Sequence, residues 1–526
     1  MSQNKRPFQY SGNARGLGKH DREIQDNYTM MQAFEWFEPA GGKYYKKMLD
    51  KAESLGQMGI TALWLPPPTK ASSQEGNGYD IYDHWDLGEF EKPGDKGTAT
   101  KFGTKQELID LIKKLKDNGV VAYIDCVSNH KAGADFKETF HAIEVDQNDR
   151  NKEISDPYEI EGWTGFNFPG RKGKYSKLEW HHFHFTGVDW DARNEKKSIF
   201  KIQGEGKHWA EKVDGEKGSF DYLMFADIDH AHPDVSKDWF EWSEWILKET
   251  GAVGFRFDAV KHIDRDFIRD FIKEARKRND NPDLFGVGGG WSKLEFWKDD
   301  IQSLHAYLDG IDEQFSVFDT PLHYNFKEFS DAGENYDLRK IFDGSIVQAR
   351  PTDAVTLVDN HDTQPGEALE SWVASVWKPL CYALILWRND GYPCVFAGDL
   401  YGSAEGSPHP FEAVSQLDDF IRIRKNFTYG PTNDYFDHAQ CLGFTRLGES
   451  LHKNGCAVVM CSGSEPGTKR MQVNPEAKGQ IWTDILGWRQ GEVEIGDDGF
   501  AEFSCSERSV SCWVWKDAPE RDQFKK

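Results

Sequence analysis

The chain has 526 residues, of which 38% are hydrophobic and 29% charged, a balance typical of folded globular proteins and not of disordered ones. This length exceeds what one ordinary core can bury and predicts two or three domains. The formal net charge of −24 argues against nucleic acid or an anionic membrane as partner, and it is compatible with a neutral substrate or a bound cation.

The N-terminal segment has no apolar core of the signal-peptide kind, and no apolar run approaches the ~20 residues that span a bilayer. The eight cysteines show no paired spacing, so we expect reduced thiols in the cytoplasm. Separately, we expect a monomer. One alternative stays open, because Cys505 and Cys512 could face each other across a hairpin.

After a polar arm at residues 1–25, strand-like and helix-like segments alternate. Short apolar strands are predicted at 28–36, 60–67, 120–130, 254–260, 284–288, 313–319, 354–362 and 394–400. Helices are predicted at 43–59, 104–119, 235–250, 264–278, 298–308, 322–342, 370–388 and 411–425. Eight strand–helix units with buried strands predict an α/β fold, the parallel (β/α)8 TIM barrel.

Two parts of the chain leave this alternation. Residues 131–232 are polar, rich in glycine and aromatic, and we interpret them as a domain inserted after the third strand. Residues 428–526 contain short alternating segments that are typical of a small antiparallel sheet domain. The barrel itself is therefore predicted to comprise residues 26–130 and 233–427.

Polar side chains recur where three barrel strands end. The third strand ends in DCVSNH (125–130), the fourth in GFRFDAVKH (254–262) and the seventh in LVDNHD (357–362). One such strand end is more often a helix cap, but barrel enzymes build their active sites at these ends, so three together predict a site. Converging carboxylates without a Ser or Cys nucleophile motif fit glycosidic bond cleavage, in which one carboxylate attacks and another donates a proton.

Arg256 precedes Asp258 by two residues, so both side chains leave the strand on one face. The guanidinium would hold Asp258 ionised and oriented, and a purely structural salt bridge is the alternative.

The three strand ends DCVSNH, GFRFDAVKH and LVDNHD resemble signature regions of glycoside hydrolase family 13, the α-amylase family. MQAFEW, GYDIYDHWDLGEF and DYLMFADIDHAHPDV narrow the resemblance to the liquefying bacterial and intracellular fungal members, and it covers residues 28–515. It implies a barrel called domain A, a calcium-binding domain B after strand three, and a C-terminal antiparallel β-sandwich called domain C. It also implies retaining endo-hydrolysis of α-1,4-glucosidic bonds in starch, glycogen or maltooligosaccharides, through a covalent glycosyl-enzyme.

Carried onto this sequence, the resemblance makes Asp258 the nucleophile and Asp362 the carboxylate that stabilises the transition state, with Asp125 and Arg256 as a supporting pair. The substrate-binding positions that it implies are Tyr79, His130, Arg256, Lys261, His262 and His361.

Calcium prefers six to eight hard oxygen ligands. The resemblance implies that Asn129, Asp221, Asp227 and the carbonyl group of His262 supply them. Liquefying bacterial enzymes often have further aspartates for a second cation cluster, but the matching positions here are Thr186, Ala210 and Ala231. Since neutral side chains cannot offset more cations, we predict a single calcium ion.

The fifth strand should deliver the general acid from a motif of the type Val-Gly-Glu-aromatic-Trp, and two alignments compete. Direct register places Gly289, which carries no proton, at the acid position. The alternative treats GGWSKL (289–294) as an insertion, so that Glu295 is the acid and EFWKDDIQSLHAYL continues in family register. Insertions are tolerated at this face of a barrel, and we favour the second alignment.

The inserted residues would affect activity through the position of Glu295. A retaining mechanism needs its two carboxyl groups roughly 5–5.5 Å apart, and a misplacement of about 1 Å is costly. The sequence therefore leaves two alternatives to a hydrolase: a 4-α-glucanotransferase, or a weakly active glucan-binding protein if Glu295 is displaced.

Overall fold

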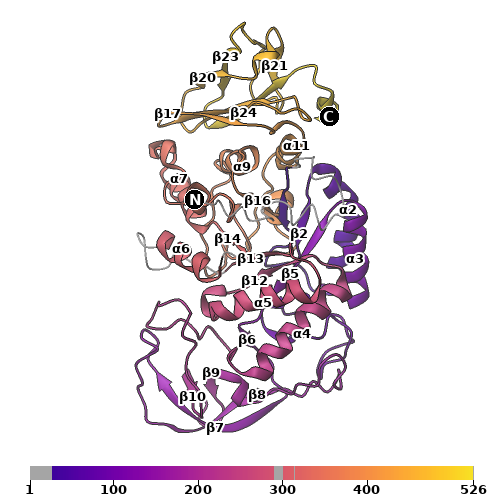
Figure 1. Ribbon diagram of the computed structural model, residues 1–526, viewed down its shortest axis with the longest axis vertical. Coiled ribbons are helices and arrows are strands. Elements are labelled where there is room, and N and C mark those ends of the chain that lie inside the picture. Colours follow the sequence, from indigo (N-terminus) through magenta and orange to yellow (C-terminus); the bar gives the residue numbers. More distant parts are fainter. Residues whose placement is uncertain (1–26, 290–299, 313, 525–526) are drawn as a thin grey trace.

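The computed structural model describes residues 27–289, 300–312 and 314–524. At its centre lies a closed barrel of eight parallel strands in the order β1-β16-β15-β14-β13-β12-β5-β2 (Figure 1). The strands are β1 Met30–Gln32, β2 Ala62–Trp64, β5 Val121–Cys126, β12 Gly254–Phe257, β13 Phe285–Gly288, β14 Ser316–Phe318, β15 Ala354–Leu357 and β16 Tyr392–Phe396. The predicted barrel is confirmed, with one strand inside each predicted segment or overlapping it.

The helices follow the strands and cover the outside of the barrel. They are α2 Tyr44–Met58, α3 Lys105–Asp117, α4 Pro233–Thr250, α5 Arg265–Arg278, α6 Asp300–Gly310, α7 Thr320–Ala332, α8 Ile346–Ala349, α9 Lys378–Trp387, α10 Ala397–Tyr401 and α11 Leu417–Phe427. Helix α3 illustrates the two sequence signals of a surface helix, a capped first turn and one apolar face. Thr104 and Glu107 close a reciprocal capping box at its start, and its apolar stripe, which includes Leu108 and Leu115, is buried.

Several predicted element ends were wrong, and three of them show the physical reason. The strand predicted at 394–400 stops at Phe396, where α10 begins. The helix predicted at 322–342 ends at Ala332, because Gly333 adopts a φ of 56° and the chain continues in short 3-10 turns. The helix predicted from 370 begins at Lys378, where the rigid backbone of Pro379 suits a first turn.

A six-stranded sheet is inserted between β5 and α4, and it lies at the lower end of the molecule in Figure 1. Its order is β6-β11-β9-β10-β7-β8, from β6 His130–Lys131, β7 Phe136–Val145, β8 Tyr158–Gly165, β9 Phe185–Asp191, β10 Lys196–Ile202 and β11 Ala226–Ile228. A separate hairpin of β3 Lys70–Ala71 and β4 Ile81–Asp83 lies against β6. The boundaries 131–232 stay a prediction.

Two antiparallel sheets form the C-terminal part, at the top of Figure 1. The larger has the order β17-β18-β19-β24-β21-β22, and β20-β23 packs against it as a second layer. The strands are β17 Thr432–His438, β18 Cys441–Arg446, β19 Cys456–Cys461, β20 Gly467–Gln472, β21 Ile481–Asp484, β22 Val493–Glu494, β23 Phe500–Cys505 and β24 Ser509–Trp515. None of the helices in the described part of the chain is long and apolar enough to cross a membrane.

Candidate active site

A buried ion-pair network joins the ends of two neighbouring barrel strands. The register places Arg256 of β12 beside Asp125 of β5, and its Nη1 lies 2.9 and 3.1 Å from the two Asp125 carboxylate oxygens. The same nitrogen donates to Asp258 Oδ1 at 2.8 Å. One guanidinium thus bridges two carboxylates, a charge-assisted arrangement that fixes the direction in which Asp258 points.

The two carboxylates differ in their access to solvent. The Asp125 side chain is fully buried, and its Oδ2 also accepts hydrogen bonds from Trp64 Nε1 and Tyr79 OH, both at 2.8 Å. Burial raises the pKa of Asp125 to about 6, and Arg256 opposes that rise. The Asp258 side chain, in contrast, is 16% exposed, so a substrate atom can reach it.

The loop after β15 brings His361 and Asp362 to the same end of the barrel. His361 Nδ1 lies 2.7 Å from Gln32 Nε2, and its ring stacks on Tyr79 at a centroid distance of 5.2 Å. Burial and the charge of Arg256 lower the pKa of His361, so the imidazole is neutral near pH 7. Asp362 Oδ1 lies 3.3 Å from His361 Nε2, and its side chain is 34% exposed.

Three further predicted residues surround this group. His130 Nε2 bonds to the carbonyl oxygen of Tyr79 at 2.7 Å, which ties the β6 end to the Tyr79 loop. Lys261 lies over the ring of Phe220 and pairs with Glu216 at 3.4 Å. His262 Nδ1 donates to the carbonyl oxygen of Phe220 at 2.6 Å. Lys261 and His262 therefore link the loop after β12 to the inserted segment.

The general acid is predicted to follow the end of β13. Gly289 directly follows the strand and stays tied to the β12 segment, because its N–H donates to the carbonyl oxygen of Phe257 and its own carbonyl oxygen accepts from Val260. A Cβ at Gly289 would lie 2.9–3.3 Å from the Arg256 guanidinium. Arg256 Nε is buried and has no hydrogen-bond acceptor among the described residues. Glu295, the predicted acid, lies outside the described residues.

Three of the four predicted calcium ligands, Asn129, Asp221 and Asp227, lie close together at the inserted sheet. Asn129 Nδ2 donates to Asp227 Oδ1 at 3.1 Å, and Thr186 Oγ1 donates to Asp227 Oδ2 at 2.5 Å. Asp221 accepts from the backbone N–H of Ala210 at 3.0 Å. Burial raises the pKa of both aspartates, and the charge of Asp221 raises that of Asp227 further. Two buried carboxylates that repel one another suit a hard cation.

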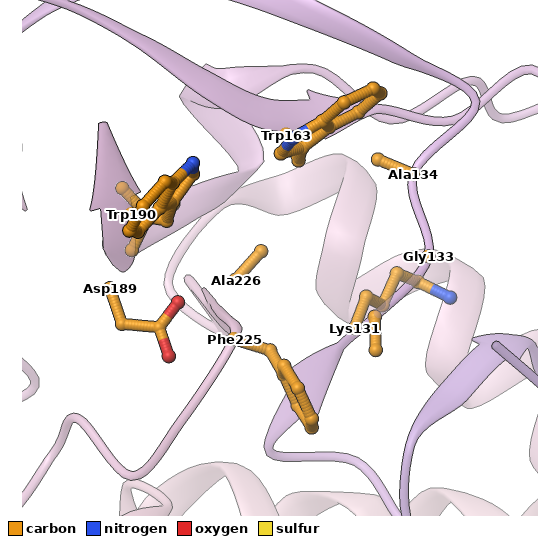
Figure 2. Close-up of a pocket in the computed structure, with 10 residues that line it drawn as sticks. Lys131, Gly133, Ala134, Trp163, Asp189, Trp190, Phe225 and Ala226 are labelled. Carbon is orange, nitrogen blue, oxygen red and sulfur yellow. The ribbon is translucent and has the colours of Figure 1, made fainter. Parts of the chain in front are cut away.

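A cavity of about 400 Å³, which the sequence did not reveal, lies in the inserted sheet (Figure 2). Two tryptophans, Trp163 and Trp190, border it with Asp189 and Phe225, and the rings of Trp163 and Trp190 are 47% and 38% exposed. Phe225 has a φ of 53°, which non-glycine residues rarely adopt, and its ring lies 5.5 Å from that of His130. The only sequence signal was the high aromatic content.

Large aromatic faces with a carboxylate nearby are typical of sites that bind sugars. One reachable carboxylate held by an arginine, with a second exposed carboxylate at the same end of the barrel, defines the barrel as a glycoside hydrolase.

Comparisons with known proteins agree with that class. Residues 45–434 match the family described as alpha amylase, catalytic domain. The chain is 46% identical over 494 residues to a glucan 1,4-alpha-maltohexaosidase of Bacillus sp. (strain 707), covering 93% of each chain. It is 39% identical over 499 residues to a cytoplasmic alpha-amylase of Escherichia coli (strain K12), covering 93% of this chain and 99% of the relative.

Among solved structures, an alpha-amylase of Geobacillus thermoleovorans in complex with acarbose matches with a TM-score of 0.59 and 17% identity. The match covers 94% of this chain and 98% of that one, and it shows the shared fold. The chain belongs to the α-amylase family, and its relatives named alpha-amylase and maltohexaosidase support the endo-hydrolysis of α-1,4-glucosidic bonds by this chain.

Proposed function

We propose that the chain is a retaining α-amylase in which Asp258 is the nucleophile, Glu295 the acid and base, and Asp362 the transition-state stabiliser. The observation that supports this most is the contrast between Asp125 and Asp258. Arg256 holds both carboxylates, but only Asp258 is open to solvent. An ionised, oriented and reachable carboxylate is what attack on an anomeric carbon requires.

The reaction proceeds in two displacements at the anomeric carbon. Asp258 forms the bond to carbon while Glu295 gives its proton to the departing glycosidic oxygen. Glu295 then takes a proton from water, whose oxygen displaces Asp258 and restores the original configuration. Asp362 offsets the positive charge that develops on the sugar, and the neutral imidazoles of His130 and His361 bond its hydroxyl groups.

Two features of the described residues support an acidic side chain at the end of β13. Arg256 Nε is a buried donor without an acceptor among the described residues, and it lies 3.0 Å from the place that a Gly289 Cβ would take. A carboxylate at this place would satisfy that donor, and a buried donor left unsatisfied costs free energy. The bare Gly289 leaves the space for it.

The stereochemistry of the first product tests this function. We expect proton NMR of a fresh maltoheptaose digest to show the α-anomer before mutarotation, and starch chains to shorten internally from the outset. Initial β-anomer would contradict the two-displacement mechanism. Products longer than maltoheptaose as the main outcome would instead identify a 4-α-glucanotransferase.

We propose that one calcium ion binds here, held by Asn129, Asp221, Asp227 and the carbonyl group of His262. A bound calcium ion would neutralise the two repelling carboxylates and so join the inserted sheet to the barrel. Neutral Thr186 and Ala210 already satisfy Asp227 and Asp221 by hydrogen bonds, which supports one ion instead of a cluster.

Removal of calcium is expected to destabilise the protein. Binding at a free concentration one hundred times Kd contributes about 2.7 kcal/mol, so chelation should lower the unfolding temperature. Differential scanning calorimetry with and without EDTA measures this, and metal analysis should find one calcium per chain. The Asp227→Asn variant is the matched control, since its unfolding temperature should respond weakly to added calcium. An unchanged unfolding temperature in EDTA would refute the site.

The cavity between Trp163 and Trp190 is proposed to bind a glucan chain that extends from the catalytic centre. Phe225 joins the two, because it lines the cavity and contacts the ring of His130. Exposed indole rings stack on sugar faces, and Asp189 can accept a hydrogen bond from a hydroxyl group.

Replacing Trp163 by Ala should therefore weaken the binding of long substrates selectively. Loss of about 1 kcal/mol of stacking predicts a roughly five-fold lower kcat/KM on maltoheptaose. Maltotriose has fewer sugar units to place in the cavity, so its rate should fall much less. Leu451→Ala, which removes another exposed apolar side chain from the loop between β18 and β19, is the control. Equal losses on both substrates would contradict the assignment.

A cytoplasmic location is proposed as well. All eight cysteines are free and buried, which suits a reducing compartment, and one relative is named as a cytoplasmic alpha-amylase. Starch-like or glycogen-like glucans are the proposed substrates there.

A further inference from the structure

The C-terminal sheets contain a cluster of three thiols that the hydrolase does not use. Cys441, Cys461 and Cys505 belong to one apolar core between the two sheet layers. Gly467 lies beside all three side chains, so the thiols of Cys441, Cys461 and Cys505 gather at one place.

Cys441 and Cys461 are direct cross-strand partners in β18 and β19. The hydrogen bond from Ser462 N to Gln440 O, at 2.9 Å, flanks this pair and shows that it is of the non-hydrogen-bonded type. At such pairs the Cα atoms lie about 4.5 Å apart and the side chains are closest. This separation lies within the range that a disulfide spans, about 4.4–6.8 Å.

Gly467 makes room for the sulfurs. It pairs with Cys505 across β20 and β23, and a Cβ at this position would lie 2.7 Å from Cys441 Sγ and 3.3 Å from Cys505 Sγ. Any larger residue would push the thiols apart.

A small reagent can approach the cluster from one end of the sheet. Cys441 and Cys461 are 7% and 3% exposed. Cys461 Sγ lies 3.3 Å from the carbonyl oxygen of Glu465, a residue in an exposed turn. Cys456 and Cys512 lie on the opposite face of the larger sheet, where both are fully buried in the main core. The open alternative of a Cys505–Cys512 pair was wrong, because these two thiols lie in different cores.

We propose that this cluster is an oxidative modification site at which hydrogen peroxide links Cys461 to Cys441 in a reversible disulfide. The Cys461 sulfur attacks peroxide, the O–O bond breaks, and a sulfenic acid and one water form. The Cys441 sulfur then attacks the sulfenic sulfur, and the second oxygen leaves as water with the thiol proton. Two thiols and one peroxide thus give one disulfide and two waters.

The test uses the full chain treated with hydrogen peroxide, then alkylated under denaturing conditions, digested without reduction and analysed by mass spectrometry. We expect a cross-linked peptide pair containing Cys441 and Cys461, loss of two titratable thiols per chain, and full recovery of both with dithiothreitol. Cys441→Ser should abolish the cross-link, and Cys456→Ser should leave it unchanged.

Circular dichroism of each variant separates a lost cross-link from a lost fold, and Cys461→Ala provides a second variant should Cys441→Ser not fold. A first cross-link at Cys456–Cys512 or at Cys461–Cys505 would overturn the proposal. Oxidation of Cys461 to sulfinic acid with no cross-link would overturn it equally.

Discussion

Asp258→Asn should lower kcat on starch by roughly four orders of magnitude, because the glycosyl-enzyme cannot form without the nucleophile. Asparagine has nearly the shape of aspartate, and Arg256 keeps its buried partner Asp125, so the fold should persist. Steady-state kinetics with reducing-sugar detection, alongside thermal unfolding, measures both effects.

Asp125→Asn is the matched comparison, since the same guanidinium holds both carboxylates. This substitution removes a sealed charge that accepts from Trp64 and Tyr79, so it should lower the unfolding temperature more than Asp258→Asn does. Its effect on kcat should be smaller, because Asp125 is not reachable by substrate. If Asp258→Asn kept more than a tenth of wild-type kcat, the nucleophile would have to be reassigned.

Glu295→Gln should lower kcat on starch by roughly 10²–10⁴-fold, the usual contribution of general acid–base catalysis. The reason is specific to the leaving group, since an alkoxide leaves poorly without a proton. Fluoride leaves without one, so the first displacement on an α-maltosyl fluoride should proceed at nearly the wild-type rate. Measuring fluoride release in a single turnover isolates that step from the water-dependent second one.

Glu367→Gln is the control for Glu295. Burial and the charge of Asp362 raise the pKa of Glu367 to about 7, so this carboxyl group could also carry a proton near the site. We expect its replacement to change kcat on starch less than three-fold. Full activity of Glu295→Gln together with loss of activity in Glu367→Gln would identify Glu367 as the acid and refute our alignment of the fifth strand.

Much of the barrel could be predicted from the sequence because its signals are local. Short apolar strands with capped amphipathic helices between them specify strand–helix units, and the barrel rule then brings all strand ends to one face. Asp125, Arg256 and Asp258 were predictable together for that reason. Element ends were harder, as the strand that stops at Phe396 shows, because apolar composition alone does not separate a strand from the helix after it.

The sequence by itself determined the barrel, the polar strand ends and the resemblance that assigns them roles, since each depends on residues close together in the chain. The tertiary structure alone decided which distant residues meet. Trp163, Trp190 and Phe225 come from separate parts of the inserted segment and form one cavity only when its strands pair. Likewise, strand register and layer packing bring Cys461 and Cys505 together at Gly467, because pairing between distant strands depends on the whole sheet and not on local spacing.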